Sequence, residues 1–82
     1  MAVMRTSVQL VIDDRREYEP DMTATQALEA VLREAKLHHI HTHDPIGRAY
    51  AAVLRHPKQA RFDAKEIERH EHRTKQAHHH GV

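Results

Sequence analysis

Four histidines gather in the middle of the chain, just before Asp44. On a β-strand, His39 and His41 would lie about 6.5–7 Å apart on one side, which lets two imidazoles bind one zinc ion. His43 or Asp44 is then a candidate third ligand. On a helix, the pair at i, i+4 would instead be His39 and His43. The spacing permits a zinc site at His39, His41 and His43 in either geometry; the alternative is a set of exposed polar side chains.

Two further histidine patterns lie near the C-terminus. His70 and His72 fall on a predicted helix, where side chains at i, i+2 diverge and cannot share one ion. The run His78–His80 would bind nickel or copper weakly in any protein, so it carries no information about function.

A second chemical pattern is the basic C-terminal end. Residues 55–82 hold seven Lys/Arg against four Asp/Glu, whereas residues 1–54 hold six against eight. On a helix, a row of cations at i, i+4, i+8 can contact phosphates or an acidic protein. Three glutamates on the same helix oppose a phosphate backbone, and the chain has only three aromatic residues for base stacking. The alternative is a solvated helix with internal ion pairs. The candidate contact residues are Arg61, Lys65, Arg69 and Arg73.

Catalysis is the least favoured function. The chain has no cysteine, and no nucleophile elbow, phosphate loop or HExxH pattern is present. Ser7, the single serine, has no identifiable partner. We therefore expect a protein that is not an enzyme and that has no cofactor, unless the histidine cluster binds zinc.

The best-defined element is a helix over residues 23–36. Thr23 and Gln26 form a capping-box pattern. Apolar residues then recur at helical spacing, with charged residues on the opposite side. This pattern predicts a helix with one face in the core, which the rest of the chain must cover.

Residues 5–19 are predicted to form a β-hairpin. Val8, Leu10 and Ile12 alternate with polar residues, as in a half-buried strand, and Tyr18 suits a return strand that ends before Pro20. The same N-terminal strand would also allow a ribbon-helix-helix fold with Arg5, Ser7 and Gln9 in a major groove. That alternative is disfavoured, because residues 13–20 put too much chain between the strand and the first helix.

The order of hairpin, short loop and helix, with Tyr18-Glu-Pro-Asp-Met-Thr23 before a Leu- and Ala-rich helix, resembles the opening of a β-grasp domain. The resemblance implies a hairpin packed on the helix at 23–36. It implies no activity, because the iron-ligating cysteines of the ferredoxin members are absent and the chain ends His80-Gly81-Val82 where ubiquitin-like members have Gly-Gly.

Two more helices complete the expected fold. Asp44-Pro45 is a helix start, and the residue before Pro57 marks the end of that helix. Asp63 and Glu66 suggest a cap for a third, charged helix over residues 64–76, after a linker at 58–62. The fold class is therefore predicted as α+β: a compact hairpin-helix-helix body over 1–62, and a looser charged helix with a disordered histidine-rich tail over 63–82. The predicted core is Val8, Leu10, Ile12, Tyr18, Leu28, Val31, Leu32, Ile46, Tyr50, Val53, Leu54 and Phe62.

These features together favour a small accessory or regulatory protein that docks on a larger protein partner. Nucleic-acid binding through the basic C-terminal helix is the alternative, and zinc binding by the histidines is the third. No apolar run reaches the roughly 18 residues of a membrane span, so we expect no membrane partner and a cytoplasmic location. A homodimer would add buried area to a domain of this size. The arginine-rich, asparagine-free composition is typical of small proteins of GC-rich bacteria or their phages.

Overall fold

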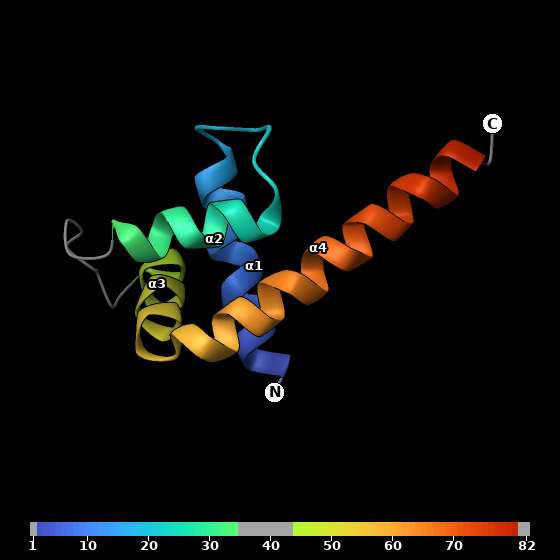
Figure 1. Cartoon of the computed structure of the whole chain (residues 1–82). Coiled ribbons are helices and arrows are strands. Elements are labelled where there is room, and N and C mark those ends of the chain that lie inside the picture. Colours follow the sequence, from blue (N-terminus) through green and yellow to red (C-terminus); the bar gives the residue numbers. More distant parts are fainter. Residues whose placement is uncertain (1, 35–43, 81–82) are drawn as a thin grey trace.

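The chain forms four α-helices in the parts that the structure describes. A computed structural model describes residues 2–34 and 44–80, with side chains over 5–34 and 44–73. The helices are α1 (Ala2–Arg16), α2 (Ala24–Arg33), α3 (Pro45–Arg55) and α4 (Pro57–His80), as Figure 1 shows. These residues contain no β-strand. The predicted α+β class is therefore wrong, and the protein is all-helical over its described length.

The N-terminal hairpin is replaced by helix α1 and a turn at residues 17–23. Both patterns are present in the sequence: Val8, Leu10 and Ile12 alternate, but Val8, Val11 and Ile12 also have the i, i+3, i+4 spacing of a helix face. In the structure Val8, Val11 and Ile12 are fully buried, whereas Leu10 is 38% exposed. Burial of one helical face against three other helices overrides the β-propensity of the valines and isoleucine. The β-grasp resemblance and the ribbon-helix-helix alternative both require an N-terminal strand, and the structure has helix α1 in its place.

The two predicted helix starts at Thr23 and Asp44 are confirmed. The Thr23 hydroxyl accepts a hydrogen bond from the Gln26 backbone N–H, and the Gln26 side-chain carbonyl accepts one from the Thr23 N–H, both at 3.0 Å. Asp44 accepts from the backbone N–H of Ile46 at 3.3 Å, directly before the first residue of α3, Pro45. Each cap satisfies backbone donors that a helix N-terminus otherwise leaves unpaired.

Helix α4 begins at Pro57, six residues earlier than the predicted cap at Asp63. His56 alone separates it from α3, and Pro57 occupies a first-turn position that suits its fixed φ and missing N–H. The expected linker at 58–62 is therefore the first part of a helix. This helix runs to His80, so it also includes the predicted third helix over 64–76 and the tail residues up to 80.

The core lies where α1 packs against the other three helices. In Figure 1, α1 passes behind α2, while α4 starts beside α3, crosses α1 and then projects beyond the other helices. Small alanines on α2, α3 and α4 let the helices approach closely. The buried cluster is Val8, Val11, Ile12, Ala24, Ala27, Leu28, Val31, Ala49, Val53, Ala60, Ala64 and Ile67. Four predicted core residues are instead exposed: Leu10, Tyr18, Ile46 and Phe62.

Polar contacts tie α1 to its neighbours near its C-terminal end. The Tyr50 hydroxyl of α3 donates to Asp14 Oδ2 at 2.6 Å. Burial, together with this hydrogen bond to a carboxylate, raises the pKa of Tyr50 above its ordinary value. Arg15 forms an ion pair with Glu34, just past α2, and a second with Glu19 at 2.9 Å. None of the described helices is both long enough and apolar enough to span a bilayer.

Candidate interaction surface on helix α4

Three of the four acidic side chains of α4 turn toward the body of the protein. Asp63 is only 5% exposed and accepts from the Gln59 side-chain amide at 3.1 Å. Glu68 accepts from the backbone N–H of Thr25 on α2 at 3.0 Å. Glu71 receives two hydrogen bonds from the Arg16 guanidinium of α1. Asp63 is therefore buried within α4, and Glu68 and Glu71 bond to neighbouring helices. Glu66, four residues after Phe62 and three before Arg69, lies instead on the solvent side and pairs with Arg69.

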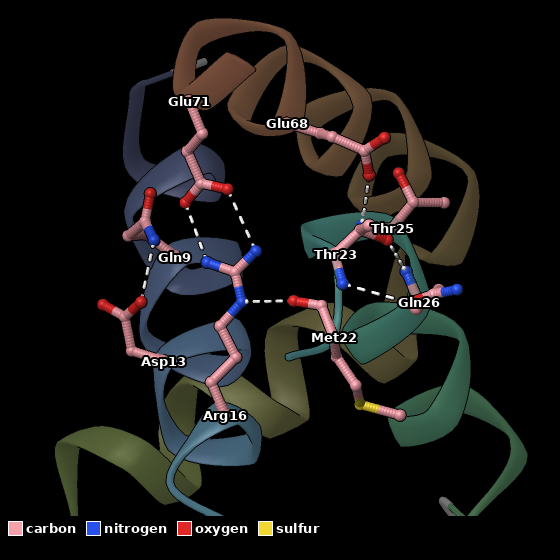
Figure 2. A network of polar contacts seen from close by, with 9 residues as sticks. All are labelled: Gln9, Asp13, Arg16, Met22, Thr23, Thr25, Gln26, Glu68 and Glu71. Atoms are coloured by element: carbon pink, nitrogen blue, oxygen red, sulfur yellow. Dashed lines mark hydrogen bonds and ion pairs between the residues drawn. The ribbon is translucent and has the colours of Figure 1, made fainter. Parts of the chain in front are cut away.

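Arg16 joins three parts of the chain at one point, shown in Figure 2. Two of its nitrogens donate to the two oxygens of Glu71 at 2.8 and 3.0 Å. Its Nε donates to the carbonyl oxygen of Met22, in the turn between α1 and α2, at 3.0 Å. This two-pronged, charge-assisted geometry is the strong form of an arginine–carboxylate pair. It fixes both the turn and the middle of α4 against the end of α1.

Glu68 places a negative charge at the N-terminus of α2. The free N–H groups and the helix dipole favour an anion at that position. Hydrogen bonds from Thr25, from its side chain and then its backbone, hold the pKa of Glu68 below the ordinary value. The contact therefore joins α4 to α2 as long as Glu68 is ionised.

The cations of α4 lie on the side that faces solvent. The positions i, i+4, i+7, i+11 and i+15 from residue 58 fall on one side of an α-helix, opposite the buried Ala60, Ala64 and Ile67. All five residues at these positions are exposed, and Phe62 among them is 59% exposed. They span about 22 Å of helix at ~1.5 Å per residue. We call this the outward face of α4: Lys58, Phe62, Lys65, Arg69 and Arg73.

Most of these cations are available to a partner. Within the described residues, no ion pair involves Lys58, Lys65 or Arg73. Arg69 has an ion pair with Glu66 at 3.1 Å, but its side chain is still 65% exposed. Pairs of this exposed kind contribute little to stability, so a partner can replace them at small cost.

Of the four predicted contact residues, the structure brings three together and separates one. Lys65, Arg69 and Arg73 share the outward face. Arg61 lies toward α2, where its Nε donates to Glu29 at 2.8 Å. This pairing raises the pKa of Arg61 and occupies its guanidinium. Arg61 thus joins α4 to α2, although half of its side chain is exposed.

Lys58 and Phe62 belong to the outward face but were not predicted as contact residues. Their spacing to Lys65 and Arg69 is the signal that identifies them, and it becomes visible only when the helix starts at Pro57. A start at Asp63 left Lys58 in a linker and placed Phe62 in the core.

The predicted zinc ligands His39, His41 and His43 lie outside the described residues. Among the residues that are described, no group of three or more His, Asp or Glu side chains has the arrangement of a metal site. His70 and His72 are both exposed on α4, where side chains at i, i+2 point in different directions.

Comparison with protein-family models, curated proteins and solved structures finds no match for this chain. Its function is therefore inferred from the arrangement of its own residues.

Proposed function

We propose that this protein is a small non-enzymatic accessory protein that docks, in the cytoplasm, on the acidic surface of a larger protein through the outward face of α4. The observation that carries the proposal is the sorting of charge on that helix. Three of its four carboxylates, at 63, 68 and 71, turn inward, and its cations at 58, 65, 69 and 73 lie on the same side of the helix as the exposed ring of Phe62, with Glu66 as the one carboxylate beside them.

This arrangement has the parts of a helical recognition element. An exposed aromatic side chain can fill a pocket on the partner and supply most of the binding energy. The surrounding lysines and arginines steer the encounter and select a partner of opposite charge. The rigid helix presents these groups at fixed spacing, as in complexes where a helix lies in a groove of its partner.

The fixed attachment of α4 supports the same proposal. Ala60, Ala64 and Ile67 are buried, and Arg16 and Thr25 hold Glu71 and Glu68. The outward face is thus presented by a helix that is already formed along these residues. A preformed helix loses less conformational entropy on binding than a segment that must fold against its partner.

A pull-down from the source organism tests this function. The baits are the N-terminally tagged wild-type chain, a Lys65→Glu/Arg69→Glu variant, and the control Arg55→Glu, which reverses an exposed cation on α3. Each lysate is divided into nuclease-treated and untreated halves, and the captured proteins are quantified by mass spectrometry. We expect a stoichiometric protein that survives nuclease, that the control retains and that the double variant loses. Equal recovery by all three baits would contradict the proposal.

Nucleic-acid binding through the same face is the second candidate, and a specific observation favours it. Glu68 and Glu71 point away from the cations, and Tyr18 and Phe62 are exposed, so both objections that the sequence raised are weakened. A nucleic-acid complex requires a steep loss of affinity with salt, with a slope that falls by about one for each phosphate contact removed. Capture that collapses on nuclease treatment, and a smaller salt slope in the double variant, would favour this candidate over a protein partner.

A further inference from the structure

The turn after α1 has the opposite charge to the outward face of α4. Arg15 and Arg16 point inward, to Glu34 and Glu71, so the carboxylates around them dominate the surface. Tyr18, at the middle of the turn, is 80% exposed. The exposed carboxylates of the turn are Glu17, Glu19 and Asp21, and Glu19 pairs with Arg15. We call the other two, Glu17 and Asp21, the acidic rim.

A groove lies between the turn and α4, and Asp21 is the residue of the acidic rim that lines it. It has a volume of about 1140 Å³ and is lined by Pro20, Asp21 and Met22 of the turn on one side. On the other side it is lined by α4, where Glu68 and Glu71 are already bonded to Thr25 and Arg16. The cations of this wall are Lys65 and Arg69, and we call them the basic rim. Asp21 and Lys65 both line the groove, and the described residues contain no ion pair between them. One face of the protein therefore has an acidic and a basic rim side by side.

The groove cannot close on itself without breaking other contacts. Met22 is held by Arg16, and Thr23 by the capping box of α2, so the turn is fixed on its side. Helix α4 is fixed by Glu68 and Glu71 on the other (Figure 2). The opposite charges of the two rims are thus kept apart within one chain, and the charges of another molecule can pair with them.

We propose that the occupant of this groove is a second copy of the chain, related by a two-fold axis that runs through the groove. A two-fold interface must be self-complementary, and adjacent acidic and basic halves meet this condition. The acidic rim of each copy then faces the basic rim of the other. Pro20 and Met22, which line the groove, supply apolar area at the centre, and the exposed Tyr18 of the same turn adds area beside them. The proposal rests on the charge layout alone, independently of docking on a larger protein.

The charge layout makes a reciprocal test available. The acid-reversed variant is Glu17→Lys/Asp21→Lys, and the base-reversed variant is Lys65→Glu/Arg69→Glu. Each variant has two rims of the same sign, so neither pairs with itself. Mixed together, the two variants again present opposite charges across both contacts. Arg55→Glu changes an exposed cation away from the groove and is the matched control.

Sedimentation velocity on the full chain, at concentrations up to about 0.5 mM, measures the result. We expect the wild type and the control to self-associate, and to dissociate as NaCl rises from about 0.05 to about 0.5 M. We expect each reversed variant to associate about tenfold more weakly, and the equimolar mixture to regain association. Circular dichroism verifies that each variant is folded. If one is not, the neutral pair Glu17→Gln/Asp21→Gln or Lys65→Gln/Arg69→Gln takes its place, with weakening as the readout.

Three results would overturn the proposal. A wild type that stays monomeric at low salt excludes the dimer. Self-association that neither reversal weakens places the interface elsewhere. Loss of association in both variants without recovery in the mixture shows that the two rims do not contact each other.

Discussion

Arg16 is the side chain on which the position of α4 depends most. Its three nitrogens reach Glu71 on α4 and the carbonyl oxygen of Met22, and its side chain is only 21% exposed. Charge-assisted hydrogen bonds in partly buried places are worth more than the exposed pairs of the protein surface. Glu71, 34% exposed, would be left without its cation if Arg16 were removed.

We expect Arg16→Ala to lower the free energy of unfolding by about 1–3 kcal/mol, because it removes the hydrogen bonds to Glu71 and Met22 together. Arg16→Lys keeps the charge but loses the two-pronged geometry, and we expect an intermediate effect. Urea denaturation measures both, with Arg55→Ala as an exposed control. If Arg16→Ala and Arg55→Ala have equal midpoints, Arg16 does not hold α4.

The pH dependence of stability should report on Glu68. Its pKa is lower in the folded protein than in the unfolded chain, so its contribution is complete above the unfolded value of about 4.5. That contribution is lost as pH falls through the lower, folded pKa. Urea denaturation between about pH 6 and pH 3 therefore shows a smaller acid loss for Glu68→Gln than for the wild type. Identical pH profiles would mean that Glu68 is not held in its ionised form by Thr25.

At the scale of the elements, sequence reasoning succeeds where the signal is local. Thr23 with Gln26, and Asp44 with Pro45, define helix starts through contacts within one turn, and both are confirmed. Residues 5–16 satisfy strand alternation and helical spacing at once, and contacts with three distant helices decide between them. Pro57 has two interpretations as well, since a proline can follow one helix and begin the next.

Two substitutions in α1 separate the helix from the predicted strand. Val11 is fully buried and Leu10 is 38% exposed, whereas a strand would place Leu10 on the core face and Val11 on the other. We expect Val11→Ala to cost about 1–3 kcal/mol and Leu10→Ala clearly less, because only Val11 leaves a cavity in the core. Chemical denaturation of the two variants measures the difference. A larger loss of unfolding free energy for Leu10→Ala than for Val11→Ala would contradict the helix and favour the strand.

The candidate site was predictable in part for the same reason. Lys65, Arg69 and Arg73 fall on one side of any α-helix that contains them, so their alignment can be predicted from the helical period alone. The inward position of Glu68 and Glu71 could not be predicted, because it depends on Arg16 and Thr25 in other helices. Lys58 and Phe62 were not predicted as contact residues only because the predicted helix began at Asp63 instead of Pro57.

At the scale of the whole molecule, packing converts a nearly neutral chain into a polarised surface. The formal net charge is only +1. Arg15 and Arg16 at the end of α1 pair with Glu34 and Glu71 and leave Glu17 and Asp21 of the turn exposed. On α4, Glu68 and Glu71 face the body of the protein, and Lys65, Arg69 and Arg73 face solvent. Surface potentials of this kind affect association more than stability. A second copy and an acidic partner would both contact Lys65 and Arg69, so we expect them to compete.

Lysine footprinting decides whether the outward face of α4 is the docking surface. The acetylation rates of Lys58 and Lys65 are compared in the free protein and in its complex with the captured partner, in dilute solution that disfavours self-association. With the partner at about ten times its Kd, both rates should fall about tenfold. Unchanged rates at Lys58 and Lys65 in a fully formed complex would show that the partner binds elsewhere and would contradict the proposed function.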